Sequence, residues 1–129
     1  MRSNSLARFM SHYRRARDLK ERDLSDYLIY TALAMECFQA TNSLIEIGER
    51  FVVDLDRYPA TYSDIFQIMY EEGAITREEL RALKRLIFLR NPIAHEYYGI
   101  SEEELREMAD LLDVAERIVR RLMKHSHPS

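Results

Sequence analysis

One long apolar stripe constrains the fold of this sequence more than any other feature. Apolar or small side chains recur every three or four residues between positions 29 and 51, namely Ile29, Leu33, Cys37, Ala40, Leu44, Ile47 and Phe51. This spacing places them all on one face of an α-helix. We therefore predict a helix over about residues 25–54, which is about 45 Å long at 1.5 Å per residue and must form the centre of the fold.

A polar ridge follows the same predicted helix, made by Gln39, Asn42, Glu46 and Glu49 at three- and four-residue steps. Most ridges of this kind face water, because one side of a helix in a globular protein is solvated.

Four more helices are predicted around this one. Three of them begin at a Thr or Ser that precedes an acidic residue by three positions, so that the two side chains satisfy free N–H groups of the first turn. The three pairs are Thr61 with Asp64, Thr76 with Glu79, and Ser101 with Glu104. The remaining helix is the first in chain order and covers about residues 5–20. Its apolar positions are few, and we expect it to fray or to dock on a partner.

The composition favours an all-α, up-and-down bundle of about five helices. Hydrophobic residues make up 47% of the chain and charged residues 32%, and only three Gly and three Pro are available for tight turns. A chain of 129 residues is expected to form a single domain over residues 1–129 with a core of its own. The lone cysteine, Cys37, cannot form an internal disulfide and should be a small buried hydrophobe.

Several functional classes find no support. No apolar run approaches the roughly eighteen residues of a membrane span, and the first residues lack the apolar core of a signal peptide. We therefore expect a cytoplasmic protein. Gly-rich phosphate loops and metal-ligand spacings are also missing, so we expect neither a metal nor a cofactor. The basic segment 2–22 holds seven Arg or Lys; a solvated helix face is the simpler interpretation, and guidance of RNA is the other.

The apolar stripe of the fourth predicted helix ends in a cation. Leu83 and Leu86 lie on this stripe, and the next position on it, seven residues after Leu83, is Arg90. Such a charge needs a carboxylate or an anionic ligand. We also expect Pro92 to interrupt the helix, because proline lacks an N–H and disfavours helix at the preceding residue.

Arg90 and His95 together can support RNA cleavage without a metal. An Arg grips a phosphate through two hydrogen bonds, and a His gives or takes a proton at neutral pH. A two-fold dimer would bring two copies of each residue to one cleft. The alternative is structural: Arg90 pairs with Glu96 or Glu46, and His95 is an ordinary loop residue.

The spacing of these residues resembles a known signature. Arg90, four further residues, His95, one residue and Tyr97 match the Arg-x4-His-x-Tyr motif of HEPN-domain proteins, in particular the HepT-like toxins. The resemblance covers about residues 24–123. It implies a helical homodimer that acts as a metal-independent endoribonuclease, the toxin of a type VII toxin–antitoxin system, with its active site at the dimer interface.

The resemblance also implies residue roles and a partner. Arg90 and His95 would be catalytic and Asn91 would support them. A minimal nucleotidyltransferase antitoxin would attach AMP to Tyr97, or else to Tyr98. Relatives often carry an acidic residue on the central helix one turn before Asn42, a role that is lost here or taken by Glu46.

We expect the dimer to form through the fourth and fifth helices or through the long second one, and tRNA or mRNA to be the substrate. The rival hypothesis is a helical module without catalytic activity that binds a nucleotide or only docks the nucleotidyltransferase.

Overall fold

The described residues, 2–95 and 99–126 of this computed structural model, form five helices and no strand. They are α1 (Arg2–Leu19), α2 (Tyr27–Val53), α3 (Tyr62–Glu71), α4 (Arg77–His95) and α5 (Glu102–Ser126). The all-α, five-helix prediction is confirmed.

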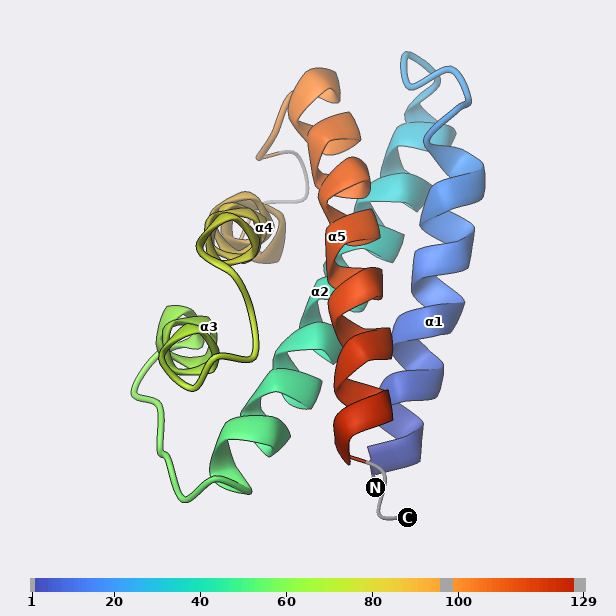
Figure 1. The fold of residues 1–129 in the computed structure, drawn as a ribbon. Coiled ribbons are helices and arrows are strands. Elements are labelled where there is room, and N and C mark those ends of the chain that lie inside the picture. Colours follow the sequence, from blue (N-terminus) through green and yellow to red (C-terminus); the bar gives the residue numbers. More distant parts are fainter. Residues whose placement is uncertain (1, 96–98, 127–129) are drawn as a thin grey trace.

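The helices are arranged around α2 (Figure 1). Helices α1, α2 and α5 lie side by side, whereas α3 and α4 are seen end-on in that view and therefore cross the other three. Helix α2 packs against each of the other four helices. The element with the longest apolar stripe is thus also the element around which the core is built.

The predicted stripe of α2 forms the centre of the core. Leu33, Cys37, Ala40 and Leu44 are buried against the other helices. Burial raises the pKa of the Cys37 thiol, as expected for a cysteine that serves as a small hydrophobe. The helix begins two residues later than predicted, because the carboxylate of Asp26 accepts the N–H of Leu28 as the N-cap.

The expectation that the first helix frays or docks elsewhere is wrong. Phe9, Tyr13 and Ala16 of α1 are buried, and the rings of Phe9 and Tyr13 stack on each other. The Tyr13 hydroxyl donates to Asp113 of α5 at 2.7 Å. Burial is the main cause that raises the pKa of Tyr13, and this bond adds to it. Few apolar residues are enough here because they fall on one face.

Two bidentate ion pairs connect α4 to α5. Arg85 donates to both carboxylate oxygens of Glu107 at 2.8 and 2.9 Å. Arg121 of α5 does the same to Glu79 at 3.0 and 2.7 Å, and it also donates to the carbonyl of Ala74. Paired hydrogen bonds of this kind fix orientation as well as distance. Helix α4, which carries the motif, is therefore held at two points along its length.

The predicted interruption at Pro92 is wrong, because α4 continues through it to His95. The proline removes the backbone hydrogen bond that its own N–H would donate to the carbonyl four residues earlier, and packing on both sides of it compensates. Leu89 and Ile93 on either side are buried and hold this turn against the core. Arg90, Asn91 and His95 therefore lie on one continuous helix.

The cap predictions are confirmed. Thr61 accepts the N–H of Asp64, and the two capping boxes are complete: Thr76 and Glu79 exchange bonds of 2.9 and 3.1 Å, as do Ser101 and Glu104.

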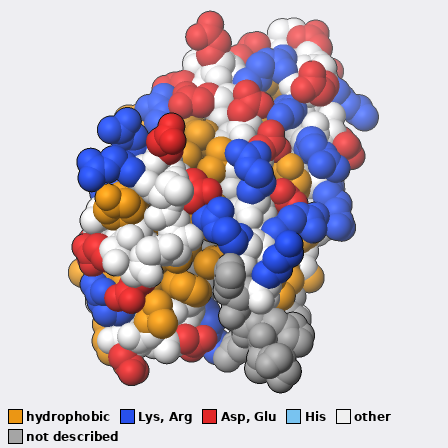
Figure 2. Space-filling view, in the orientation of Figure 1, with side chains coloured by type: hydrophobic (Ala, Val, Ile, Leu, Met, Phe, Trp, Pro, Cys, Tyr) orange, Lys and Arg blue, Asp and Glu red, His pale blue; other side chains and the backbone are white. Residues whose placement is uncertain are grey.

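The surface over α5 carries side chains of both charges, with smaller hydrophobic patches between them (Figure 2). No helix within the ranges 2–95 and 99–126 combines the length and hydropathy that are needed to cross a membrane.

The burial of α1 leads to a prediction for stability. Replacing Phe9 by Ala should lower the free energy of unfolding by about 3–5 kcal/mol, the usual cost of emptying a fully buried aromatic site. Urea denaturation followed by circular dichroism measures this value. Leu55→Ala, at an exposed leucine, is the matched control and should cost little. A loss below about 1 kcal/mol for Phe9→Ala would place α1 outside the cooperative core.

Candidate active site

Arg90 is held by two amide groups. Its Nε donates to Oδ1 of Asn42 on α2 at 3.0 Å, and one terminal nitrogen donates to Oδ1 of Asn91 at 3.2 Å. The side chain is half-buried at the junction of α2 and α4. The position of the guanidinium is thus fixed by a residue of the polar ridge on the central helix.

Two aromatic rings lie against the same guanidinium. Its central carbon is 5.2 Å from the ring centre of Phe38 on α2 and 5.2 Å from that of Tyr62 on α3. Both distances are within the range of a cation–π interaction. Three helices therefore contribute to the site of Arg90. The role of Phe38 and Asn42 is hinted at by their four-residue spacing, whereas nothing in the sequence links Tyr62 to Arg90.

No carboxylate among the described residues lies within ion-pair distance of Arg90. The suggested pairing with Glu46 is wrong, because Glu46 instead accepts from Ser5 at 2.8 Å and from Arg8 at 2.6 Å on α1. The bond from Ser5 is the first cause that lowers the pKa of Glu46, and the contacts with Arg8 add to it. The other suggested partner, Glu96, lies outside the described residues.

His95 is the last residue of α4 and is exposed. It lies four residues after Asn91, so the two side chains are about 40° apart around the helix and share one face. Arg90 lies five residues before His95, which separates them by about 140° around the axis and about 7.5 Å along it. Arg90 and His95 of this chain therefore lie on different sides of α4.

The chain after the motif is held close to α4. A Cβ atom on Gly99 would lie 2.2 Å from the Cβ of Pro92 and 2.9 Å from its backbone, so only glycine fits there. The hydroxyl of Tyr30 on α2 donates to the carbonyl of the next residue, Ile100. The proposed acceptors Tyr97 and Tyr98 belong to residues 96–98, outside the described part of the chain.

The outer face of α2 beside this site carries exposed apolar side chains. Leu28 is 75% exposed and Met35 is 37% exposed, although both belong to the central helix. On α4, Phe88 is 60% exposed and lies on the face of Asn91 and His95, because the steps between them are three and four residues. These three exposed residues belong to the two helices that carry Asn42 and Arg90, and we call them the α2–α4 rim.

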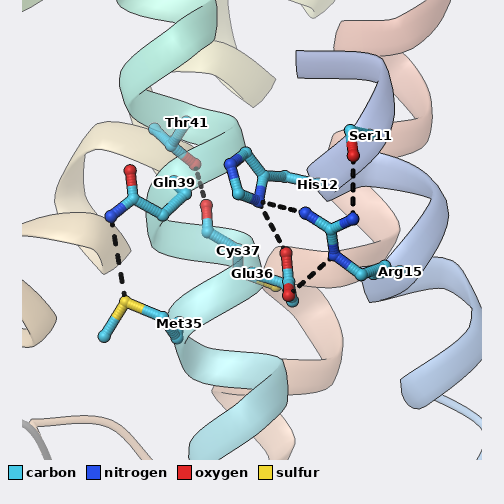
Figure 3. A network of polar contacts seen from close by, with 8 residues as sticks. All are labelled: Ser11, His12, Arg15, Met35, Glu36, Cys37, Gln39 and Thr41. Atoms are coloured by element: carbon cyan, nitrogen blue, oxygen red, sulfur yellow. Dashed lines mark hydrogen bonds and ion pairs between the residues drawn. The ribbon is translucent and has the colours of Figure 1, made fainter. Parts of the chain in front are cut away.

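A polar network on α1 and α2 lies next to this face (Figure 3). Glu36 of α2 contacts Nδ1 of His12 at 2.6 Å and accepts from Nε of Arg15 at 2.9 Å, and Arg15 also donates to Ser11. A terminal nitrogen of Arg15 also lies 3.2 Å from Nδ1 of His12, so that the three side chains contact one another. Part of the basic charge of segment 2–22 is thus used to attach α1 to α2.

Within the described ranges, no group of three or more His, Cys, Asp or Glu side chains is placed so as to hold a metal ion. The described groups that contact Arg90 are two amide oxygens, which accept from it, and two aromatic rings.

A family model described as ribonuclease HepT-like matches residues 4–122. This match covers nearly the whole chain and includes the motif on α4. The protein therefore belongs to the HepT-like ribonuclease family. No curated protein matches the sequence significantly.

Solved structures share the fold. A tri-AMPylated HEPN toxin of Shewanella oneidensis in complex with MNT antitoxin superposes with a TM-score of 0.84 at 17% identity, over 95% of this chain and 96% of that chain. A toxin–antitoxin structure with AMP-PNP gives 0.85 at 15% identity, over 95% and 97%. YutE of Bacillus subtilis, a cytosolic protein of unknown function, gives 0.78 at 22% identity, over 99% and 92%.

The contact between Gly99 and Pro92 leads to a second prediction. Gly99→Ala should destabilise the protein by about 1–3 kcal/mol, the usual cost of overpacking a fixed backbone. The loss should be measured by urea denaturation. Gly73→Ala is the comparison, since no atom lies within 4 Å of its added Cβ and the strain comes only from φ of +79°. A Gly99→Ala protein as stable as wild type would show that the chain after α4 is not packed on Pro92.

Proposed function

We propose that this protein is a metal-independent endoribonuclease, the toxin of a type VII toxin–antitoxin pair, with a composite active site at a homodimer interface. The observation that carries the proposal is the state of Arg90: half-buried, fixed by Asn42 and Asn91, and without a carboxylate partner among the described residues. A guanidinium in this state is a ready binding site for a phosphate. Membership of the HepT-like family supports the same activity.

The proposed residues suffice for one reaction. The ribose 2′-OH loses its proton to a neutral His95 and attacks the adjacent phosphorus. Arg90 stabilises the charge that builds on the non-bridging oxygens. The bond from phosphorus to the 5′-oxygen then breaks, and a protonated His95 gives that oxygen its proton. The products are a cyclic phosphate and a free 5′-hydroxyl, and no metal or cofactor takes part.

Two features support a site shared between protomers. One His cannot act as base and acid at the same moment, and Arg90 and His95 of one protomer lie about 140° apart around α4. A two-fold axis beside the end of α4 would bring a second Arg and a second His to the same cleft.

The α2–α4 rim is the surface that we propose for the dimer. Of the two routes that the sequence suggests, α5 is the less suitable, because its apolar stripe is already buried inside the protomer. The outer face of α2, where Leu28 and Met35 are exposed, still has apolar area to bury.

We further propose that a minimal nucleotidyltransferase silences the protein by transfer of AMP to Tyr97, with Tyr98 as the second choice. An adenylate on a phenol two residues after His95 would bring an anionic group to the place that an RNA phosphate must occupy. The similarity in fold to a tri-AMPylated HEPN toxin that was solved with an MNT antitoxin supports this proposal.

Cleavage is tested first with Arg90→Ala and His95→Ala. Wild type, confirmed as unmodified by intact mass, should cut a pool of tRNA and mRNA in the presence of EDTA. Each variant should lose at least about 100-fold in rate, as expected when a charge-stabilising or proton-transferring group is removed. Tyr58→Phe, at a remote exposed tyrosine, controls for nonspecific effects. If His95→Ala retains full cleavage, the ribonuclease proposal fails. If wild type does not cleave RNA but binds the antitoxin, the result favours the alternative of a docking module.

The composite site is tested by mixing the two inactive variants. After subunit exchange, half of the protein or less consists of mixed dimers, each with one intact Arg90 and one intact His95. Because a mixed dimer has a single His95 for the two proton transfers, we expect cleavage by the mixture to exceed that of either variant alone and to stay well below wild type. If each protomer holds a complete site of its own, the mixture is no more active than the separate variants.

Modification is tested with Tyr97→Phe. Incubation with a cognate nucleotidyltransferase, ATP and Mg²⁺ should add the mass of AMP groups to wild type and silence its cleavage. The variant should stay active and gain fewer groups, because it lacks the proposed acceptor hydroxyl. Tyr98→Phe is the matched control at the neighbouring position. Equal modification of wild type and Tyr97→Phe would show that the acceptor lies elsewhere.

A further inference from the structure

The guanidinium of Arg90 has an edge from which no described residue accepts a hydrogen bond. A guanidinium carries five N–H donors, and Arg90 uses one on Nε for Asn42 and one on a terminal nitrogen for Asn91. The remaining three donors lie on the two terminal nitrogens, and no described residue accepts from them. This edge matches the two-pronged geometry with which Arg binds a phosphate.

Among the described residues, each group that contacts Arg90 is formally neutral. Its contacts are the amides of Asn42 and Asn91 and the rings of Phe38 and Tyr62. Other arginines of the same protein are treated differently. Arg85 and Arg121, which tie α4 to α5, each make a bidentate pair with a glutamate, and these hydrogen bonds raise the pKa of both guanidinium groups.

The two rings restrict the plane of the guanidinium. Phe38 is half-buried on α2, and Tyr62 is 46% exposed at the start of α3. The central carbon of the Arg90 guanidinium lies 5.2 Å from the centre of each ring, and Nε is hydrogen-bonded to Asn42. These contacts fix the direction in which the free edge of the guanidinium points. Preorganisation of this kind lowers the cost of ordering the side chain when a ligand binds.

We propose that Asn42, Phe38 and Tyr62 are positioning residues that hold Arg90 without neutralising it, so that its whole charge is available to one phosphate of a bound RNA strand. This inference rests on the proposed ribonuclease function and adds the residues that prepare its cationic centre. An acidic residue in the place of Asn42 would hold the guanidinium as firmly, and it would compete with the phosphate for the same charge.

Asn42→Asp separates these two effects, because it keeps the shape of the side chain and the acceptor oxygen while it adds a charge. The probe is a fluorescently labelled 2′-O-methyl oligonucleotide that cannot be cleaved, with binding followed by anisotropy at several salt concentrations. We expect about tenfold weaker binding, and a log–log salt slope smaller by about 0.7, the value for one lost phosphate contact to a single strand. The melting temperature should stay at or above that of wild type.

Asn42→Ala is the complementary variant. It removes the hydrogen bond but adds no charge, so the salt slope should stay as in wild type while the turnover rate on cleavable RNA falls more than KM rises. Tyr62→Leu should behave in the same way to a smaller extent. The matched controls make identical changes at exposed positions outside the site, namely Asn4→Asp and Tyr58→Leu, and should leave both quantities unchanged.

The outcomes for this inference differ from those for the ribonuclease proposal. If wild type binds the probe and Asn42→Asp binds it more weakly and with a smaller salt slope, the inference that neutral residues hold Arg90 is supported. This outcome counts even where no RNA is cleaved and the proposed activity fails. If Asn42→Asp binds as tightly and with the same slope as wild type, the inference is overturned. It is equally overturned if Asn42→Asp melts well below wild type and Asn42→Ala shows the same loss of slope, because Asn42 would then act only on folding.

Discussion

The packing of α2 against four other helices is the constraint on which the rest of this structure depends. Its buried face assembles the core, and its outer face supplies Phe38 and Asn42 to the candidate site. The other contributors reach that site only because they pack on α2: α3 brings Tyr62, and α4 brings Arg90. A half-buried cation is costly unless its surroundings are ordered. The interior of the bundle supplies that order, since close-packed helices leave little freedom to the side chains at their junctions.

The arginines differ in what they touch. One group, with members on α1, α4 and α5, pairs with carboxylates of a neighbouring helix, as Arg8 does with Glu46 and Arg85 with Glu107. Exposed pairs of this kind contribute little to stability, although bidentate ones fix geometry. A second group, with Arg77 beside Tyr70 as an example, contacts rings or neutral polar groups instead. Arg90 belongs to this second group, because rings and amides surround it and its charge is not compensated by any described residue. The same side chain is structural where it meets a carboxylate and available for an anion where it does not, and only the tertiary structure decides which.

Apart from the helix break at Pro92, local signals in the sequence gave correct predictions, whereas features that depend on distant partners were missed. The caps at Thr76 and Ser101 and the stripe through Leu33 and Leu44 involve residues within one or two turns, so spacing is enough to find them. The burial of Phe9 was missed because it needs α2 and α5 as partners. Tyr62 lies 28 positions before Arg90 in the printed numbering and on another helix, and no periodicity connects them. The motif spacing indicated a site on α4, whereas the residues of α2 and α3 that hold Arg90 could be identified only from the tertiary structure.

The continuity of α4 through Pro92 bears directly on how such a motif can work. If the helix had ended at Asn91, as proline suggests, the following chain could have turned and brought His95 next to Arg90 within one protomer. With α4 unbroken as far as His95, the five-residue separation fixes the two side chains about 140° apart, and Gly99 packs back on Pro92 to keep the chain close to that last turn. This separation on a continuous helix is the reason for our proposal that a second copy of the protein supplies one of the two groups that act on a single phosphate. The same geometry leaves Asn91, which binds Arg90 and shares a face with His95, as the residue that links the two halves of the proposed site.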